Sequence, residues 1–238
     1  MSLLPNQIHP SWRDFLNPEI SKILNVIEQR VGEMHNPAKE CILRFLGMDL
    51  DGIKIVILGQ DPYPEKGVAT GRAFEVGTLK TWEIPFRQVS LKNIIRLIYK
   101  ATNRIEEYNA IPRFSQIVQE MKSGRFLIPN PPAFFDDLES QGVLFLNTCF
   151  TVYPGEPLSH RDYWQPFTEA LIQYISHKNP YLCWFLWGKS AQSYKPIIFQ
   201  GNFYESRHPM MCSKVYSDDF LKSECIKNTM KIVNWTGN

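Results

Sequence analysis

The stretch I-K-I-V-I-L-G-Q-D-P-Y-P runs from residue 53 to residue 64 and decides the fold. Its first part, Ile53 to Leu58, is an apolar, β-branched run that stops at Gly59, which is typical of a strand covered on both faces in a parallel sheet. Its second part places an amide, a carboxylate and a phenol within four positions, and its two prolines restrict the backbone. We predict a buried strand that carries a stiff polar loop at its carboxyl end.

Three further runs have the same form along the chain. They are Val143 to Leu146 before Asn147, Tyr181 to Trp187 before Gly188, and the weaker Asn202 to Ser206 before Arg207-His208-Pro209. Helical patterns lie between and around these runs, over residues 18–31, 90–104 with Ser90 as the N-cap, 164–176, 190–199 and 218–233. The alternation predicts an α/β fold, a single domain with a central four-stranded, mainly parallel sheet and helices on both faces.

Length and cysteine spacing disfavour several classes of protein. The 238 residues show no repeat and no linker, so we expect one domain, with a helical N-terminal part (1–50) and a motif-bearing core (53–235). A net charge of +2 suits a small DNA footprint or a small-molecule substrate equally well. Five scattered cysteines without a C-x-x-C pair disfavour a disulfide framework, a zinc module and an iron–sulfur cluster. The sequence shows no signal peptide and no membrane span, so we expect a soluble intracellular protein.

Four loops follow the predicted strands, and ligands of such sheets bind beyond the carboxyl ends of the strands. Taken singly, each loop has an ordinary structural reading. Asp61 would cap a backbone N–H, Asn147 would end a strand, and Gly188-Lys189-Ser190 would start a helix or hold a phosphate. A lone His208 is more often structural than catalytic. Only the convergence of the four loops favours an active site.

A basic stripe recurs every four residues on the helix after Ser90. It consists of Lys92, Arg96, Lys100 and Arg104. This spacing places the four cations along one helix face, either as a solvated surface or beside a phosphate path.

The loops also carry long, ordered motifs. These are I-V-I-L-G-Q-D-P-Y at 55–63, G-R-A-F at 71–74, S-L-K-N-I at 90–94, Q-G-V-L-F-L-N-T-C-F-T-V at 141–152, S-H-x-x-x-W-x-x-F-T at 159–168, L-W-G-x-x-A-Q at 186–192, H-P at 208–209 and N-W at 234–235. In this order they resemble the main uracil-DNA glycosylase family, of which the chain looks like a divergent member, so that residues 1–238 would form one domain of that kind.

The resemblance implies a role for each motif residue. Asp61 would position water and stabilise the cationic sugar, and His208 would stabilise charge on the departing uracil. The uracil-binding residues would be Gln60, Tyr63, Phe74 and Asn147, with Phe74 stacking on the base and Tyr63 filling the space of a thymine methyl. The DNA-binding residues would be Ser90, Gly188, Lys189, Met210, Met211 and Ser213.

The sequence departs from the family pattern at several positions. Pro64 stands where the family usually has histidine, which removes a polar neighbour of the water site. The leucine wedge that enters the DNA stack falls on Cys212, which is too small for that task, so Met210 or Met211 would serve instead. Arg72 and Glu75 replace the usual apolar and small residues beside Phe74, and the proline-rich loop before Ser90 is shortened to Gln88-Val89.

The resemblance therefore implies a monofunctional DNA glycosylase of base-excision repair, which flips uracil out of DNA and hydrolyses its N-glycosidic bond to leave an abasic site. A glycosylase-like DNA-binding or scaffold protein with weak or no activity is the alternative. We expect no cofactor and no metal, uracil-containing single- or double-stranded DNA as the partner, no membrane association, and a monomer in the cytoplasm, or in the nucleus if the source is eukaryotic. A proteinaceous inhibitor or a replication protein stays open as a further partner.

Overall fold

The central element is a four-stranded sheet, seen in a computed structural model that describes residues 3–237. Its strands are β1 (Ile55–Gly59), β2 (Val143–Asn147), β3 (Cys183–Trp187) and β4 (Asn202–Ser206). They lie in the order β2-β1-β3-β4, and every pair is parallel. The predicted α/β class and four-stranded sheet are confirmed. The register pairs Gly59 with Asn147 and Trp187 with Ser206, so the ends of the strands lie along one edge of the sheet.

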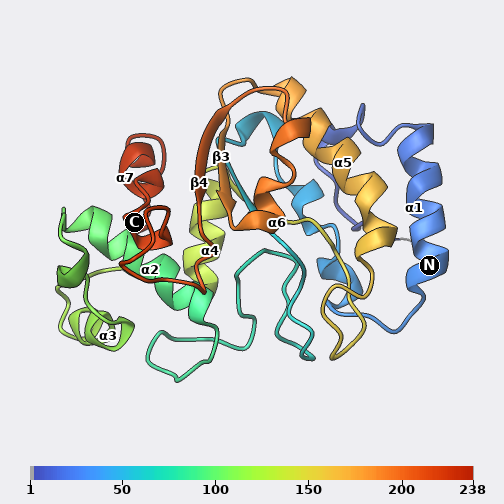
Figure 1. The fold of residues 1–238 in the computed structure, drawn as a ribbon. Helices are drawn as coiled ribbons and strands as arrows, with labels where there is room; N and C mark the ends of the chain where they lie inside the picture. The colour runs from blue at the N-terminus through green and yellow to red at the C-terminus, as the bar shows by residue number, and fades with distance from the viewer. Residues whose placement is uncertain (1–2, 238) are drawn as a thin grey trace.

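Helices cover both faces of the sheet (Figure 1). The described helices are α1 (Pro18–Val31), α2 (Val89–Thr102), α3 (Phe114–Lys122), α4 (Pro131–Ser140), α5 (Arg161–Lys178), α6 (Lys189–Gln192) and α7 (Cys225–Thr229), with short 3-10 turns between them. In Figure 1, α1 and α5 lie on one side of the sheet, while α2, α3 and α7 lie on the other.

Each strand divides its side chains between two hydrophobic cores. In β1, Val56 and Leu58 pack with α1 and α5, while Ile55 and Ile57 pack with α2, α4 and α7. Successive side chains of a strand point to opposite faces, so a sheet covered on both sides needs an unbroken apolar run. All five residues of β1, β2 and β3 are buried, and this explains why their runs were recognisable in the sequence.

Several predicted helix boundaries were wrong. The helix predicted from Ser90 begins at Val89, its N-cap is Gln88, and Ser90 lies inside the first turn. The helix predicted over residues 190–199 ends at Gln192, and a separate 3-10 turn follows at Lys195–Ile197, where a proline lacks the N–H that a longer helix needs. The helix predicted over 218–233 is also divided, into a 3-10 turn at Phe220–Lys222 and α7.

The basic stripe on α2 belongs largely to the packing of the protein. Lys100 is buried and forms an ion pair with Glu224 at 2.9 Å. Arg96 donates to the carbonyl of Pro112 at 2.9 Å, and the Lys92 ammonium lies over the Phe86 ring. The predicted single face is wrong for Lys100, which is buried in an ion pair, and for Arg104, which lies beyond the end of α2 and is exposed.

Two expectations concern features outside the site. The five cysteines are free. Among residues 3–237, no helix is both long enough and apolar enough to cross a membrane.

Candidate active site

The loops after β1 and β2 are joined by backbone hydrogen bonds at the sheet edge. The carbonyl of Gly59 accepts from the Thr148 N–H at 3.1 Å, and the carbonyl of Gln60 accepts from the Cys149 N–H at 2.9 Å and the Thr148 hydroxyl at 3.0 Å. These bonds continue the β1–β2 ladder beyond the strands. The two loops are thereby held as one rigid unit.

Gly59 makes the close approach of these loops possible. A Cβ at this position would lie 2.5 Å from the Asn147 Oδ1 atom and 2.6 Å from the Ala73 Cβ atom. Both distances are far shorter than real Cβ contacts, so only glycine fits here. The Asn147 amide and the segment before Phe74 therefore meet directly above the end of β1.

Asp61 is fixed by two hydrogen bonds to its carboxylate. Oδ2 accepts from the Leu158 backbone N–H at 2.8 Å, and Oδ1 accepts from the Gln60 amide at 3.3 Å. Burial raises the pKa of the Asp61 carboxyl above its usual value, and the two hydrogen bonds partly oppose that rise. A carboxylate in such surroundings is a strong electrostatic partner for positive charge that develops nearby.

Asn147 and Tyr63 lie beside Asp61. Asn147 is buried at the end of β2, where its amide offers both a donor and an acceptor to a ligand. Tyr63 is half-buried, and burial raises the pKa of its phenol, so the ring stays neutral. Pro64, at the position of the family histidine, gives its carbonyl to the Asn36 side chain at 2.7 Å and so serves as a structural acceptor.

Phe74 has an unusual backbone conformation, with a φ of 66°. For a bulky residue this left-handed conformation costs about 1–3 kcal/mol, so the surroundings must hold it in place. The ring lies 5.7 Å from that of Trp187 and 6.1 Å from that of His208, measured between ring centroids. Phe74 thus presents an aromatic wall to the space above Asn147.

His208 follows β4 and is oriented by its own loop. Its Nδ1 atom accepts a hydrogen bond from the Met210 N–H at 3.2 Å, so the neutral ring carries its proton on Nε2. Burial lowers the pKa of the imidazole, which favours this neutral form. Gly188 allows the ring to lie against the end of β3, because a Cβ there would be 2.9 Å from the His208 Cβ atom.

Helix α2 supports the same loop through a residue that the sequence reasoning did not single out. The Asn93 amide donates to the Pro209 carbonyl at 2.6 Å, and its oxygen accepts from Arg96 at 2.9 Å. Asn93 lies within the S-L-K-N-I motif, and that was the available signal. One member of the basic stripe therefore helps to hold the segment that carries His208.

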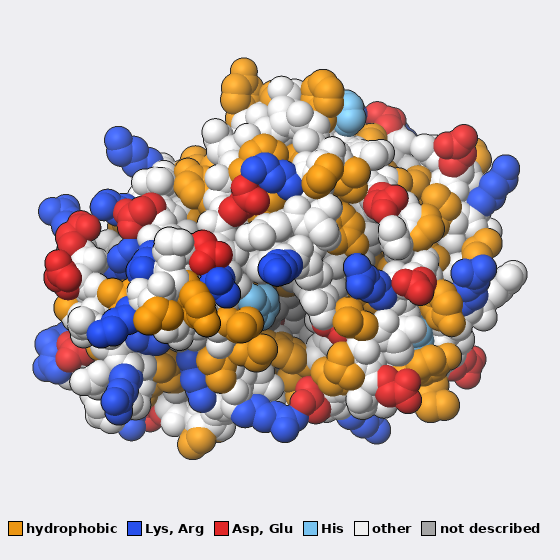
Figure 2. Space-filling model, in the orientation of Figure 1, with side chains coloured by type: hydrophobic (Ala, Val, Ile, Leu, Met, Phe, Trp, Pro, Cys, Tyr) orange, Lys and Arg blue, Asp and Glu red, His pale blue; other side chains and the backbone are white. Residues whose placement is uncertain are grey.

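These groups line one cavity of about 380 Å³, a size suited to a nucleobase. The predicted residues that line it are Gln60, Asp61, Tyr63, Phe74, Ser90, Asn147, His208, Met210 and Met211. Gly59, Pro62, Pro64, Ala69, Arg72 and Pro157 complete the wall. Figure 2 shows this face hollowed near its centre, with hydrophobic side chains and a histidine at the rim and cationic side chains around it.

The remaining predicted DNA-binding residues lie outside this lining. Gly188 and Lys189 line a smaller adjoining space of about 150 Å³ that also touches Gln60 and His208. Ser213 lines neither space, and its backbone N–H donates to the Asp219 carboxylate at 2.5 Å.

The segment after His208 exposes two of its hydrophobic side chains and packs a third toward the core. Met210 and Met211 are 60% and 53% exposed at the mouth of the cavity. Cys212, at the family's wedge position, packs inward, and its thiol contacts the Pro209 carbonyl at 3.3 Å. In this segment the two methionines are therefore exposed at the cavity mouth, while Cys212 is turned toward the core.

The S-H motif after Leu158 is a scaffold for the β2 loop. His160 is fully buried and its Nδ1 lies 2.9 Å from the Thr151 hydroxyl, which also accepts from the Trp164 indole at 2.7 Å. Thr168 donates to the Thr148 carbonyl at 2.7 Å. These bonds explain the spacing of the motif, because α5 places all three side chains beneath one loop.

Within residues 3–237, no group of three or more His, Cys, Asp or Glu side chains is arranged to hold a metal ion. The polar groups of the cavity include two amides, one carboxylate and one neutral imidazole, which suit hydrogen bonding to a planar heterocycle.

Comparison with known proteins gives the family. Residues 48–231 match the model of the Uracil DNA glycosylase superfamily. The chain belongs to this superfamily. It is 30% identical over 217 residues to a uracil-DNA glycosylase of Mycobacterium avium, covering 87% of this chain and 82% of that protein, and 35% identical over 210 residues to one of Francisella tularensis subsp. novicida, covering 84% and 83%.

Solved structures agree with this uracil-DNA glycosylase fold. The UNG of Nitratifractor salsuginis superposes with a TM-score of 0.72 at 19% identity, covering 98% of this chain and 94% of that one. The mimivirus uracil-DNA glycosylase superposes with a TM-score of 0.61 at 25% identity, covering 85% and 69%. The predicted family is thus confirmed.

Proposed function

We propose that this chain is a monofunctional uracil-DNA glycosylase of base-excision repair. The observation that carries the proposal is the single cavity that holds Asp61, Asn147, Phe74 and His208 together. A duplex must deliver its base into such a cavity by flipping it out of the stack, so the substrate is uracil-containing DNA, single- or double-stranded.

In this proposal the base is recognised before the chemistry. The flipped uracil stacks on Phe74, and the amides of Asn147 and Gln60 pair with its polar edge. Tyr63 occupies the space beside C5, where a thymine would place its methyl group, and a steric clash rejects a competitor more strongly than a lost contact does.

The chemical step is a hydrolysis. As the bond between C1′ and uracil N1 breaks, its electron pair leaves with the base and the sugar acquires oxocarbenium character. The Asp61 carboxylate stabilises that cation and positions water, whose oxygen bonds to C1′. The His208 Nε2–H donates to the uracil oxygen that becomes negative, and such a donor contributes about 3–4 kcal/mol. One water proton stays on the sugar hydroxyl and the other ends on uracil.

A uracil-containing oligonucleotide tests the proposal. After treatment with the protein and then alkali, we expect cleavage at the uracil position in both single and double strands. A matched oligonucleotide with thymine is the control. Absence of cleavage on both substrates would favour a glycosylase-like binding protein instead.

Two further parts of the proposal concern association. We propose that the chain acts as a monomer, which size-exclusion chromatography with light scattering tests. A mimivirus UNG variant has been solved in complex with UGI, at 23% identity to this chain. We propose that a protein inhibitor can block this cavity also, which the cleavage assay tests when UGI is added.

A further inference from the structure

The backbone conformation of Phe74 is not explained by the other predicted site residues that line the cavity. Its backbone is left-handed, and its ring forms the wall on which the base would stack. The segment from Thr70 to Gly77, here called the Phe74 loop, contains no regular secondary structure. Local propensity does not favour this conformation for phenylalanine, so groups around the loop must determine it.

The backbone of the loop is fixed on the side that precedes Phe74. The Ala73 N–H donates to the Phe145 carbonyl on β2 at 3.2 Å. At Gly71, a Cβ would lie 1.9 Å from the Cys41 carbonyl oxygen, so the loop lies directly against that segment. These contacts place the loop on the sheet up to Ala73, and the Gly77 N–H, which donates to the Val68 carbonyl at 2.8 Å, closes the loop at its other end. None of these bonds involves the backbone of Phe74 itself.

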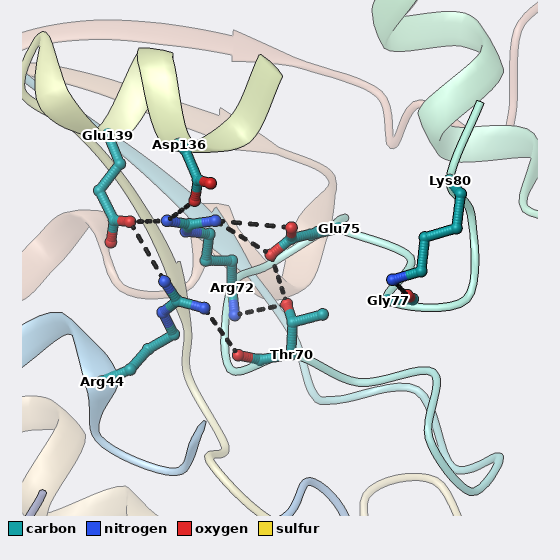
Figure 3. A network of polar contacts seen from close by, with 8 residues as sticks. All are labelled: Arg44, Thr70, Arg72, Glu75, Gly77, Lys80, Asp136 and Glu139. Atoms are coloured by element: carbon teal, nitrogen blue, oxygen red, sulfur yellow. Dashed lines mark hydrogen bonds and ion pairs between the residues drawn. The ribbon is translucent and has the colours of Figure 1, made fainter. Parts of the chain in front are cut away.

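A buried ion pair closes the turn across Phe74. Arg72 precedes the Ala73-Phe74 pair and Glu75 follows it, and their side chains are only 5% and 8% exposed. The Arg72 guanidinium contacts the Glu75 carboxylate at 3.4 Å, and the Thr70 hydroxyl donates to the same carboxylate at 2.6 Å. Figure 3 shows the Thr70 and Arg72 side chains converging on Glu75.

The same guanidinium anchors the turn to a rigid helix. Arg72 donates to Asp136 at 2.7 Å and to Glu139, both on α4 (Figure 3). Helix α4 is itself fixed by Phe134, Phe135 and Leu138, which are almost fully buried. Arg44 adds a second cation, with contacts of 3.4 Å to Glu139 and to the Thr70 carbonyl.

Arg72 also separates two cavities. One is the site described above, and the other is a space of about 460 Å³ between Arg44, Asp136 and Glu139. Removal of the guanidinium would leave the buried Glu75 without its cation, and would give the Phe74 loop room to move backwards. Lysine would not replace it fully, because one ammonium cannot match a planar fork with several acceptors.

We propose that Arg72 is a positioning residue for uracil recognition, which holds the Phe74 ring in place through its ion pairs with Glu75, Asp136 and Glu139. The proposal rests on the proposed glycosylase function for the meaning of the Phe74 wall. It gives a task to the Arg72 and Glu75 pair, which the mechanism does not otherwise use.

A double-mutant cycle of Arg72→Met and Phe74→Ala tests the proposal on uracil-containing DNA. We expect Arg72→Met to lower kcat at least tenfold and to change KM less than threefold. The inhibition constant of free uracil should rise about tenfold as well. In the Phe74→Ala background the same change should lower kcat less than threefold, because the ring it positions is gone. Equal effects in both backgrounds, or no effect on kcat, would overturn the proposal. Arg125→Met, which breaks the exposed pair with Glu120, is the matched control and should change neither parameter.

Two further measurements keep the proposal testable if the buried variant does not fold or the protein is inactive. Asp136→Asn weakens the network at a side chain that is 66% exposed, and should lower kcat in the same direction but less. A crystal structure of either variant should show Phe74 with a negative φ or with its ring moved away from Trp187. An unchanged Phe74 would overturn the positioning role, whereas an inactive wild type would overturn only the glycosylase function.

Discussion

In the proposed mechanism Asp61 stabilises the sugar cation, and this task has a cost to stability, because the half-buried carboxylate is solvated less well than it would be in water. Burial raises its pKa, so the folded protein binds this proton more readily than the unfolded chain does. The contribution of Asp61 to the free energy of unfolding therefore falls as the pH rises. The fall begins near the pKa that Asp61 has in the unfolded chain and is complete above its pKa in the folded protein. An asparagine keeps an oxygen for the Leu158 N–H and removes the charge.

We expect Asp61→Asn to lower kcat on uracil-containing DNA by about 10²–10³-fold, the size of effect typical of a lost electrostatic stabiliser. The same variant should melt at a higher temperature than the wild type at pH 7, and the difference should shrink below pH of about 4. Cleavage assays and thermal melts over a pH series measure both effects. A variant that loses activity and also melts lower at pH 7 would contradict the burial argument.

In the proposed mechanism Tyr63 discriminates against thymine by occupying the space of its methyl group. We expect Tyr63→Ala to release thymine detectably and to lower the preference for uracil by at least about tenfold, because the wall beside C5 is gone. Release of both bases from otherwise identical oligonucleotides measures the ratio. Tyr181→Ala removes a tyrosine that is 83% exposed, and should leave the ratio unchanged. An unaltered ratio in Tyr63→Ala would place the discrimination elsewhere.

At the scale of elements, the sequence predicted the buried strands well, because both of their faces are covered. It predicted the helices less well where contacts with distant parts of the chain determine their ends and their exposed faces. The runs of β1, β2 and β3 were readable because both faces of each strand are covered. Helix α4 was not predicted from the sequence; it begins at Pro131-Pro132, and prolines are common in the first turn of a helix. The four cations at positions 92 to 104 were predicted to share one helix face, but α2 ends at Thr102, before Arg104. Only the fold shows that Glu224 and the Pro112 carbonyl bind Lys100 and Arg96.

The residues of the cavity were predictable only as a set. Asp61, Asn147 and His208 each had an ordinary structural reading, and the parallel register brings their loops together. The supporting residues Asn93, Leu158 and Arg72 could not be assigned in this way, because each acts through a bond to a group far along the chain. These groups are the Pro209 carbonyl, the Asp61 carboxylate and the carboxylates of α4.

Helix α2 controls the His208 segment through Asn93. We expect Asn93→Ala to destabilise the fold by about 1–3 kcal/mol, because it leaves the Pro209 carbonyl without its buried donor and removes one of the two acceptors of the Arg96 guanidinium. It should also lower kcat/KM about tenfold by loosening the His208 loop. Denaturant unfolding and cleavage kinetics measure the two effects. Asn103→Ala, at an exposed asparagine at the end of the same helix, is the control, and equal losses in both variants would contradict the role of Asn93.

The segment from His208 to Cys212 exposes Met210 and Met211 at the mouth of the cavity, where we propose that they contact DNA. We expect the double variant Met210→Ala/Met211→Ala to lower activity on double-stranded DNA about tenfold and to change activity on single strands less than threefold, since only the duplex needs a wedge to replace the flipped base. Parallel assays on the two substrates measure this. Met34→Ala, at a methionine that is 69% exposed, serves as the control. Equal losses on both substrates would point to a general DNA contact instead.

At the scale of the whole molecule, the sheet makes the two cores interdependent. Each buried strand contributes alternate residues to the cluster with α1 and α5 and to the cluster with α2 and α4. Neither cluster can lose its structure while the strands keep theirs. The single domain expected from the sequence has a physical reason here, because no boundary divides the sheet.

We therefore expect one cooperative unfolding transition for the chain. Circular dichroism and tryptophan fluorescence in urea should give coincident curves, because Trp12 and Trp164 lie in one cluster and Trp82 and Trp187 in the other. Two separated transitions would show that the clusters unfold independently. The variant Trp164→Phe, which removes one reporter, should leave the coincidence unchanged.

Gly59 has a consequence for anyone who redesigns this chain to release another base. The hydrogen atom of that glycine is all that separates the end of β1 from the Asn147 amide and from Ala73. Libraries that randomise position 59 will consist almost entirely of misassembled proteins, whatever base is sought. Position 63 borders the same cavity, and its side chain can be exchanged without moving a strand. Laboratory evolution toward new substrates thus has one position to hold constant and one to explore.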